Sequence, residues 1–261
     1  MHNFFEFTLL IINDKVGYDM LKAVILAAGK GTRMKSDLPK VVHKCMGKAM
    51  VNHVIEASRY AGADNICVIV GYKADEVKNA IEDQVFYAEQ KEQLGTGHAV
   101  KCARDFIGNE GNVVILCGDT PLITGDTLTR LVSLHSNQGN KVTVLSAIID
   151  NPTGYGRIVR NEDGEFTKIV EQKDASEEEK SICEINSGMY VFDSAALYEA
   201  LDMLNNDNAA GEYYLTDTIE IIKGLGGKIA AMPLSGSAVD EIRGVNTLEQ
   251  LAEAEEIMKG R

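Results

Sequence analysis

The sequence predicts an α/β fold: a mostly parallel sheet flanked by helices, with a smaller antiparallel lobe. The run from Ala23 to Ala28 is continuously apolar, as in a strand that is buried on both faces of a parallel sheet. Short apolar runs then alternate with segments of helical periodicity as far as about residue 150, which favours repeated βα units. Farther along, two strand-like runs flank Asn161–Gly164, whose Asp-Gly pair indicates an antiparallel hairpin.

Apolar runs and helical periodicity place the individual elements. Strands are predicted at residues 66–70, 85–88, 113–117, 142–148, 157–160, 166–170, 185–192 and 228–232. Helices are predicted at residues 50–61, 74–81, 97–106, 195–204 and 247–259. The charged segment 171–180 and the polar segment 205–212 are predicted to be loops, and the second could cover a bound ligand.

The composition is that of one folded domain. With 261 residues, of which 45% are hydrophobic and 25% charged, the chain can bury one substantial core, and extensive disorder is excluded. Its five cysteines are widely spaced and form no Cys-x-x-Cys pair, so neither a disulfide framework nor a zinc site is indicated. This cysteine usage fits a reducing compartment, and we therefore expect a cytoplasmic protein.

The first 19 residues precede the part of the chain in which strands and helices are predicted. Phe4 to Ile12 is apolar but too short to span a bilayer, and it lacks the cationic start of a signal peptide, so no membrane association is expected. Met20 stands directly before the first predicted strand. Residues 1–19 are therefore expected to be an N-terminal extension that the fold does not need.

A loop rich in glycine and in cations follows the first predicted strand. Gly29 and Gly31 permit a backbone whose N–H groups turn towards an anion at the carboxyl end of the strand. Arg33, Lys40 and further cations lie in a segment whose only acidic residue is Asp37, although the formal net charge of the chain is -13. This contrast predicts a site for a small polyanion rather than a surface for nucleic acid. The alternative is an ordinary solvated loop.

Asp119 is the first candidate for a metal ligand. It follows the apolar strand predicted at 113–117, and a carboxylate at the carboxyl end of a central strand is well placed for Mg²⁺. A polyanion site needs a divalent cation to offset its charge. The alternative is that Asp119 caps the helix that follows Pro121.

Two familiar phosphate-binding motifs do not fit the glycine loop. Met34 stands where the dinucleotide fingerprint has its third glycine, and the Gly-Lys-Ser/Thr ending of a P-loop does not follow. Instead, Leu26–Met34 followed by Leu38–Lys40 resembles the signature of the sugar-1-phosphate nucleotidyltransferases. Later segments narrow this resemblance to the pyrophosphorylase domain of the bacterial N-acetylglucosamine-1-phosphate uridylyltransferases. These segments are 90–99, 118–119, 152–158, 169–175, 184–188, 211–217 and 244–246.

The resemblance covers nearly the whole chain from Leu21 and implies a reaction. UTP and N-acetylglucosamine 1-phosphate would give UDP-N-acetylglucosamine and pyrophosphate, with Mg²⁺, for the synthesis of cell-wall precursors. The implied fold is Rossmann-like, with a nucleotide-binding part at 20–150, a sugar-binding part at 151–245 and a C-terminal helix at 246–261. Because the attacking group is already a phosphate anion, no base is required, and cations must dominate the mechanism.

The resemblance also implies roles for individual residues. Lys40 would lie against the reacting phosphates and Arg33 near the triphosphate, while Asp119 and Asn246 would hold Mg²⁺. The nucleotide would contact Leu26, Ala27, Ala28, Gly29, Gly31, Gln90, Gly95 and Thr96, and the N-acetyl sugar would contact Gly156, Glu171 and Asn186. Taken singly, Gln90, Gly156, Glu171 and Asn186 could equally be ordinary turn, bend or surface residues.

The chain departs from the family in two respects. Bifunctional members continue into a β-helix of hexapeptide repeats that acetylates glucosamine 1-phosphate, and no such repeat occurs in these 261 residues. Acetyltransferase activity is therefore not expected, and the oligomeric state is left open. Cys117 stands where the family often has a larger residue such as tyrosine.

Other functions remain open at this stage. The chain could use another sugar 1-phosphate, such as glucose 1-phosphate, or another nucleotide. It could also be a non-catalytic sensor of nucleotide sugars, although a mere binder has no need of all these charged residues. A glycosyltransferase is less compatible, because Cys117-Gly118-Asp119 lacks the first acid of an Asp-x-Asp motif.

Overall fold

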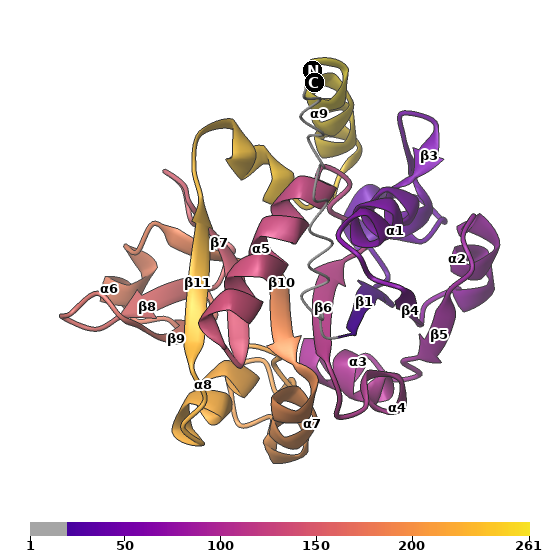
Figure 1. The fold of residues 1–261 in the computed structure, drawn as a ribbon. Coiled ribbons are helices and arrows are strands. Elements are labelled where there is room, and N and C mark those ends of the chain that lie inside the picture. Colours follow the sequence, from indigo (N-terminus) through magenta and orange to yellow (C-terminus); the bar gives the residue numbers. More distant parts are fainter. Residues whose placement is uncertain (1–19) are drawn as a thin grey trace, which may run out of the picture.

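A nine-stranded sheet forms the centre of the computed structural model, which describes residues 20–261 (Figure 1). The expectation for residues 1–19 lies outside the described residues. The strands are β1 (Leu21–Ala27), β4 (Asn65–Val70), β5 (Phe86–Glu89), β6 (Asn112–Cys117), β7 (Val142–Ile148), β8 (Arg157–Arg160), β9 (Phe166–Val170), β10 (Glu184–Asp193) and β11 (Ile229–Leu234). Strands β2 (Lys44–Cys45) and β3 (Lys48–Ala49) pair separately as a small hairpin.

The strand order of the main sheet is β11-β7-β10-β6-β1-β4-β5. Strands β6, β1, β4 and β5 run parallel, β11 runs parallel to β7, and β10 runs antiparallel to both β6 and β7. The hairpin of β8 and β9 joins the sheet through the pairing of Arg157 with Ile185 on β10. The predicted fold class is therefore confirmed, and the antiparallel strands continue the main sheet.

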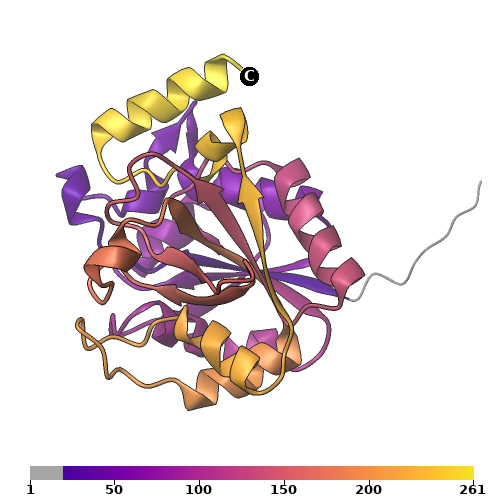
Figure 2. The ribbon, with the colours of Figure 1, turned by 90° about the vertical axis from the view of Figure 1, so that its left-hand side faces the viewer.

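Helices cover both faces of the sheet, because successive residues of the buried strands point to opposite sides. The helices are α1 (Met50–Tyr60), α2 (Ala74–Ala80), α3 (Thr96–Cys102), α4 (Arg104–Ile107), α5 (Gly125–Gln138), α6 (Glu177–Lys180), α7 (Ser194–Met203), α8 (Asp217–Gly224) and α9 (Leu248–Lys259). Ala23 and Ile25 pack in the core beneath α1 and α5, whereas Val24 packs in the core shared with α3, α7 and α8. Figure 2 shows the strands as a fan with α7 and α8 below it.

Several elements differ from those predicted. The single helix predicted at 97–106 is two helices, α3 and α4, which meet at Ala103. The loop predicted at 171–180 contains α6, which begins with a capping box between Ser176 and Glu179. Helix α5 begins at Gly125, and its N-cap is Thr124, whose side chain accepts a hydrogen bond from the Thr127 N–H. Asp119 therefore does not cap this helix.

Helix α9 returns the end of the chain to the carboxyl ends of the central strands. It packs over the β2–β3 hairpin in a small core that contains Cys45, Leu122, Val245 and Ala254. The backbone N–H of Val245 donates to the carbonyl of Asp119 at 2.8 Å. This contact fixes the segment that precedes α9 beside the end of β6. Within residues 20–261, no helix combines the length and the apolar character needed to cross a membrane.

Candidate active site

Three segments far apart in the sequence meet at Lys40. Its ammonium group forms an ion pair with Asp119 Oδ2 and donates to Asn246 Oδ1 at 2.8 Å. Arg33 Nη2 donates to the same Asn246 oxygen at 2.9 Å. The side chains of Lys40 and Asp119 are each 18% exposed, so this cluster is open to a ligand but largely shielded from bulk water. The structure thus brings together the predicted catalytic cations and the predicted metal ligands.

The sequence holds Lys40 in this position through the loop after β1. Pro39 has φ of -55° and precedes a 3₁₀ turn that begins at Lys40, and Val41 anchors the turn in the core. Gly31 has φ of +63°, and a Cβ there would lie 2.5 Å from Lys40 Cβ. Only glycine therefore allows the loop to fold back against Lys40 without displacing it.

Asp119 and Asn246 provide a donor set that suits Mg²⁺. Both supply oxygen atoms, one from a carboxylate and one from an amide, and both contact the same cation, the Lys40 ammonium group. Residues 20–261 contain no group of three or more His, Cys, Asp or Glu side chains that could hold a metal ion. Mg²⁺ commonly binds through one or two protein oxygens and completes its octahedron with water and substrate phosphates. The residues present fit that mode of binding.

A cavity of about 360 Å³ adjoins this cluster at the carboxyl ends of β1 and β6. Among its lining residues are Leu26, Ala27, Ala28, Gly29, Lys40, Gln90, Gly95, Thr96, Cys117, Asp119 and Glu212. The residues predicted to contact a nucleotide thus line one cavity, except Gly31, which packs against Lys40 instead. Their individual contacts with a ligand stay predictions.

Gln90 is oriented within this cavity by its neighbours. It is 4% exposed, and its Nε2 donates to the Gly95 carbonyl at 3.0 Å and lies 3.2 Å from His98 Nδ1. The amide group therefore has a fixed direction, as recognition of a nucleobase edge requires. No role for His98 follows from the sequence, because its proximity to Gln90 depends on how the chain folds between β5 and α3.

The segment from Leu94 to Thr96 is bound to the segment around Tyr213. The Tyr213 N–H donates to the Leu94 carbonyl at 2.8 Å, and the Leu215 N–H donates to Thr96 Oγ1 at 3.1 Å. Gly95 has φ of +111°, and a Cβ there would lie 2.5 Å from the Tyr213 carbonyl oxygen. The polar segment 205–212, which was predicted to cover a ligand, thus ends at the cavity, where Glu212 is one of the lining residues.

Strand register brings the three predicted sugar residues together. Arg157 pairs with Val170 on β9 and with Ile185 on β10. Continuing this register by one residue places Gly156 between Glu171 and Asn186, and we call these three residues the Gly156 rung. The Asn186 N–H donates to the Gly156 carbonyl at 2.9 Å, and a Cβ on Gly156 would lie 3.5 Å from Glu171 Oε2.

Hydrogen bonds fix the side chains of the rung. Asn186 Nδ2 donates to the buried Tyr190 hydroxyl at 2.7 Å, and Asn186 Oδ1 accepts from the Gly188 N–H at 3.0 Å. The Thr216 hydroxyl donates to Glu171 Oε1 at 3.0 Å. Burial raises the pKa of Glu171, and this hydrogen bond opposes the shift. No role for Tyr190 or Thr216 was predicted from the sequence.

Cys117 connects the cavity to the rung. It lines the cavity, and its thiol donates to the Gly188 carbonyl at 3.5 Å, two residues beyond Asn186. Burial and the nearby Asp119 carboxylate raise the pKa of the thiol to about 12. The thiol is therefore neutral near pH 7 and is not activated as a nucleophile.

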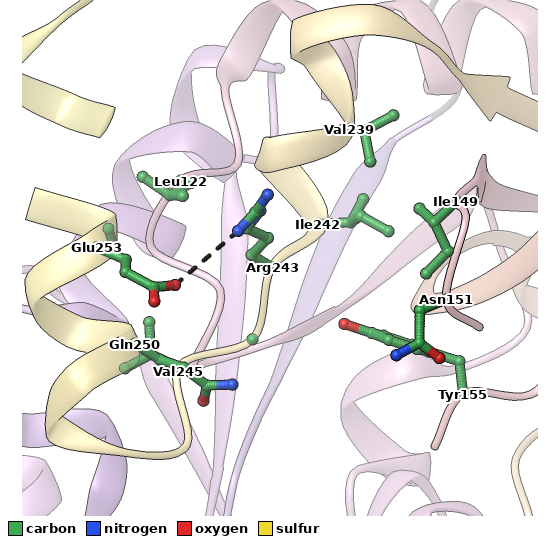
Figure 3. A pocket seen from close by; sticks show the side chains of 12 residues that line it. Leu122, Ile149, Asn151, Tyr155, Val239, Ile242, Arg243, Val245, Gln250 and Glu253 are labelled. Atoms are coloured by element: carbon green, nitrogen blue, oxygen red, sulfur yellow. Dashed lines mark ion pairs between the residues drawn. The ribbon is translucent and has the colours of Figure 1, made fainter. Parts of the chain in front are cut away.

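A second cavity, of about 230 Å³, lies beside the segment that carries Asn246 (Figure 3). Tyr155 and Asn151 line one side of it, and Arg243 and Glu253, 4.0 Å apart, line the other. None of the predicted site residues lines this cavity. Of these two cavities, the one of about 360 Å³ is lined by Lys40, Asp119 and most of the residues predicted to contact the nucleotide.

Carboxylates gather around Glu171 and make stability depend on pH. Burial, followed by repulsion from Glu171, Glu220 and Asp174, raises the pKa of Asp217 from 3.8 to about 6. Between these values the folded chain binds a proton that the unfolded chain has released, so the free energy of unfolding falls as the pH rises through this range.

We expect Asp217→Asn to be more stable than the parent chain above pH 6, because the substitution removes the repelled charge. The gain in Tm at pH 8 should be roughly 2–4 °C, as for about 1 kcal/mol in a chain of this size, allowing for solvent screening. It should shrink towards zero near pH 4, which thermal denaturation at pH 4, 6 and 8 would measure. An equal gain at all three pH values would contradict this account.

Comparison with known proteins shows which family the chain belongs to. The profile of the family described as Nucleotidyl transferase matches residues 22–237. The bifunctional protein GlmU of Clostridioides difficile (strain 630) is 54% identical over 240 residues, which are 92% of this chain and 52% of that protein. The bifunctional protein GlmU of Caldanaerobacter subterraneus subsp. tengcongensis is 57% identical over 241 residues, with the same coverage. The chain thus spans about half the length of these relatives.

A solved structure shares the fold. The crystal structure of a putative glucose-1-phosphate thymidylyltransferase from Bacillus anthracis, in complex with a sucrose, superimposes with a TM-score of 0.72 and 21% identity. The match covers 92% of this chain and 96% of that one, and it supports the fold alone. From the family match over most of its length, the chain belongs to the nucleotidyl transferase family.

Proposed function

We propose that this protein is an N-acetylglucosamine-1-phosphate uridylyltransferase. It transfers the uridylyl group of UTP to N-acetylglucosamine 1-phosphate, yielding UDP-N-acetylglucosamine and pyrophosphate for cell-wall precursors in the cytoplasm. The observation that carries this proposal is the cluster of Lys40, Asp119 and Asn246 at the edge of the cavity. A site for two polyanions needs such a cluster of cations and oxygen ligands where they meet.

The reaction needs one bond to form and one to break. An oxygen of the sugar phosphate attacks the α-phosphorus of UTP, and the bond from that phosphorus to the bridging oxygen of the departing pyrophosphate breaks. No proton has to leave the nucleophile, so the chain supplies position and charge rather than a base. Lys40 and Arg33 neutralise the negative charge on the phosphates. Asp119 and Asn246 would hold Mg²⁺, which would supply further charge neutralisation when bound.

The two substrates occupy adjoining places in this proposal. The uracil lies against Gln90, Gly95 and Thr96, and the triphosphate lies over the glycine loop after β1. The N-acetyl sugar lies on the Gly156 rung, where Glu171 accepts hydrogen bonds from its hydroxyl groups. Cys117 lies between the two places, which supports a geometry in which the sugar phosphate reaches the α-phosphorus.

Substrate selectivity tests this function. Pyrophosphate release with Mg²⁺ and UTP would be compared for N-acetylglucosamine 1-phosphate, glucosamine 1-phosphate and glucose 1-phosphate. The proposal predicts the highest kcat/KM for the acetylated sugar. A preference for glucose 1-phosphate would retain nucleotidyl transfer but refute the sugar assignment. Binding of nucleotide sugar with no turnover of any pair would support a sensor.

The contact between Gly156 and Glu171 gives a sharper prediction. In Gly156→Ala the new methyl group would lie 3.0 Å from Ile169 Cγ2 and 3.5 Å from Glu171 Oε2, so it would crowd the rung on which we propose that the sugar binds. We expect the KM for the sugar phosphate to rise about tenfold, with the KM for UTP nearly unchanged. Gly224→Ala is the control, because a Cβ there meets nothing within 4 Å. Equal increases in both KM values would contradict the assignment.

A further inference from the structure

Arg157 is a buried cation whose surroundings call for an explanation. It is 1% exposed, and in residues 20–261 all its hydrogen-bond acceptors are neutral oxygens, on Tyr155, Gln172 and Lys180. Its Nε has no partner within that range. A buried charge without an opposite charge costs free energy, and an aliphatic side chain of similar volume would avoid that cost. The segments that the guanidinium group holds in place must therefore explain why a cation is buried at this position.

The guanidinium group holds the chain on both sides of the Gly156 rung. Its Nη1 donates to the carbonyl of Tyr155, the residue before Gly156. Its Nη2 donates at 2.9 Å to Oε1 of Gln172, the residue after Glu171. The same Gln172 oxygen accepts from the Gly154 N–H at 2.9 Å. Arg157 and Gln172 thus tie the loop before β8 to the residue that follows β9 and Glu171.

The third member of the rung is held independently. Asn186 lies within β10, its N–H donates to the Gly156 carbonyl, and its side chain is fixed by Tyr190 and Gly188. Gly156 and Glu171, in contrast, lie just outside the ends of β8 and β9. The planar guanidinium group presents several donors in a fixed fork, so it can bind two chain segments at once in a defined geometry.

We propose that Arg157, acting through Gln172, is a positioning residue for the sugar phosphate. It holds Gly156 and Glu171 at the separation that the sugar requires, and it contributes nothing to nucleotide binding. Because it is buried, it does so without contact to substrate. The inference rests on the function proposed above, in that the Gly156 rung receives the sugar.

Paired variants at both positions test this role. Arg157→Met and Gln172→Leu should each raise the KM for N-acetylglucosamine 1-phosphate about tenfold or more, with the KM for UTP changed less than about twofold. Gln172→Glu keeps the acceptor for Arg157 and Gly154 and adds the missing negative charge. It should therefore retain a normal KM for the sugar phosphate and show a higher Tm than the parent chain. Arg157→Lys should resemble Arg157→Met, because an ammonium group lacks the fork.

Arg160→Met is the matched control. Arg160 lies on the same strand, is exposed, and pairs with Glu184 at 2.7 Å, so its loss should leave both KM values unchanged. Folded Arg157→Met and Gln172→Leu with a normal KM for the sugar phosphate would overturn the inference, and so would equal increases in both KM values. If Arg157→Met fails to fold, the comparison of Gln172→Leu with Gln172→Glu decides. A parent chain without turnover would instead refute the proposed function.

Discussion

Replacing Lys40 by methionine is expected to lower kcat for uridylyl transfer by roughly 10²-fold or more. The loss of one preorganised group that stabilises developing charge typically has an effect of about this size. The Lys40 ammonium group lies between Asp119 and Asn246, at the edge of the cavity, where the phosphates of both substrates are expected to meet. Methionine keeps most of the length of the side chain and removes the charge and its donors. Steady-state release of pyrophosphate would measure the effect.

The control for this variant is Lys48→Met. Lys48 lies on β3, and its ion pair with Glu56 is at the surface, so turnover should be unchanged. Lys40→Met should also bind Mn²⁺ more tightly than the parent chain when no nucleotide is present. The ammonium group then no longer competes for the Asp119 and Asn246 oxygens. Near-normal turnover, or weaker Mn²⁺ binding, would exclude the role assigned to Lys40.

Replacing Asp119 by asparagine is expected to lower Mg²⁺-dependent turnover by roughly 10³-fold. The substitution keeps the shape of the side chain but removes the charge that holds Lys40 and that would bind the metal. Although the pair is largely shielded from bulk water, Lys40 keeps its hydrogen bond to Asn246 and some contact with solvent, so the loss should cost roughly 1–3 kcal/mol of stability, less than for a fully buried pair. The fold should therefore survive, which circular dichroism would verify.

Titration of activity with Mg²⁺ would separate a lost metal ligand from general damage. Weak activity that recovers at high Mg²⁺ concentration indicates a weakened site, as the account requires. Asp202→Asn is a suitable control, because Asp202 pairs with Arg104 at the surface, away from the cavity. Full activity of Asp119→Asn at low Mg²⁺ concentration would place the metal elsewhere.

The sequence predicted the strands that position the site because their burial imposes a strong local pattern. The apolar runs of β1 and β6 read as strands buried on both faces, and their parallel pairing sets the glycine loop beside Asp119. Asn246 could be assigned only through resemblance to a family. Its arrival at Lys40 depends on the packing of α9 against the β2–β3 hairpin, which leaves no periodic signal near Asn246.

Other features of the site could not be predicted from the sequence, because they arise from tertiary contacts. Thr216 reaches Glu171, and Tyr190 reaches Asn186, only after β9, β10 and the start of α8 have come together. The hydrogen bond from Arg157 to Gln172 could not be predicted for the same reason. Helix α6 is a different case, because the capping-box residues Ser176 and Glu179 are a local signal for the start of a helix, but the charged residues around them are equally typical of a loop.

The most direct test of the account is the stoichiometry of the products. The chain would be incubated with UTP, N-acetylglucosamine 1-phosphate and Mg²⁺, and the reaction would be followed by ³¹P NMR. We predict that UDP-N-acetylglucosamine and pyrophosphate appear in equal amounts, and only when both substrates and the metal are present. Consumption of UTP without formation of the nucleotide sugar, or no consumption although UTP binds, would contradict uridylyl transfer at this site.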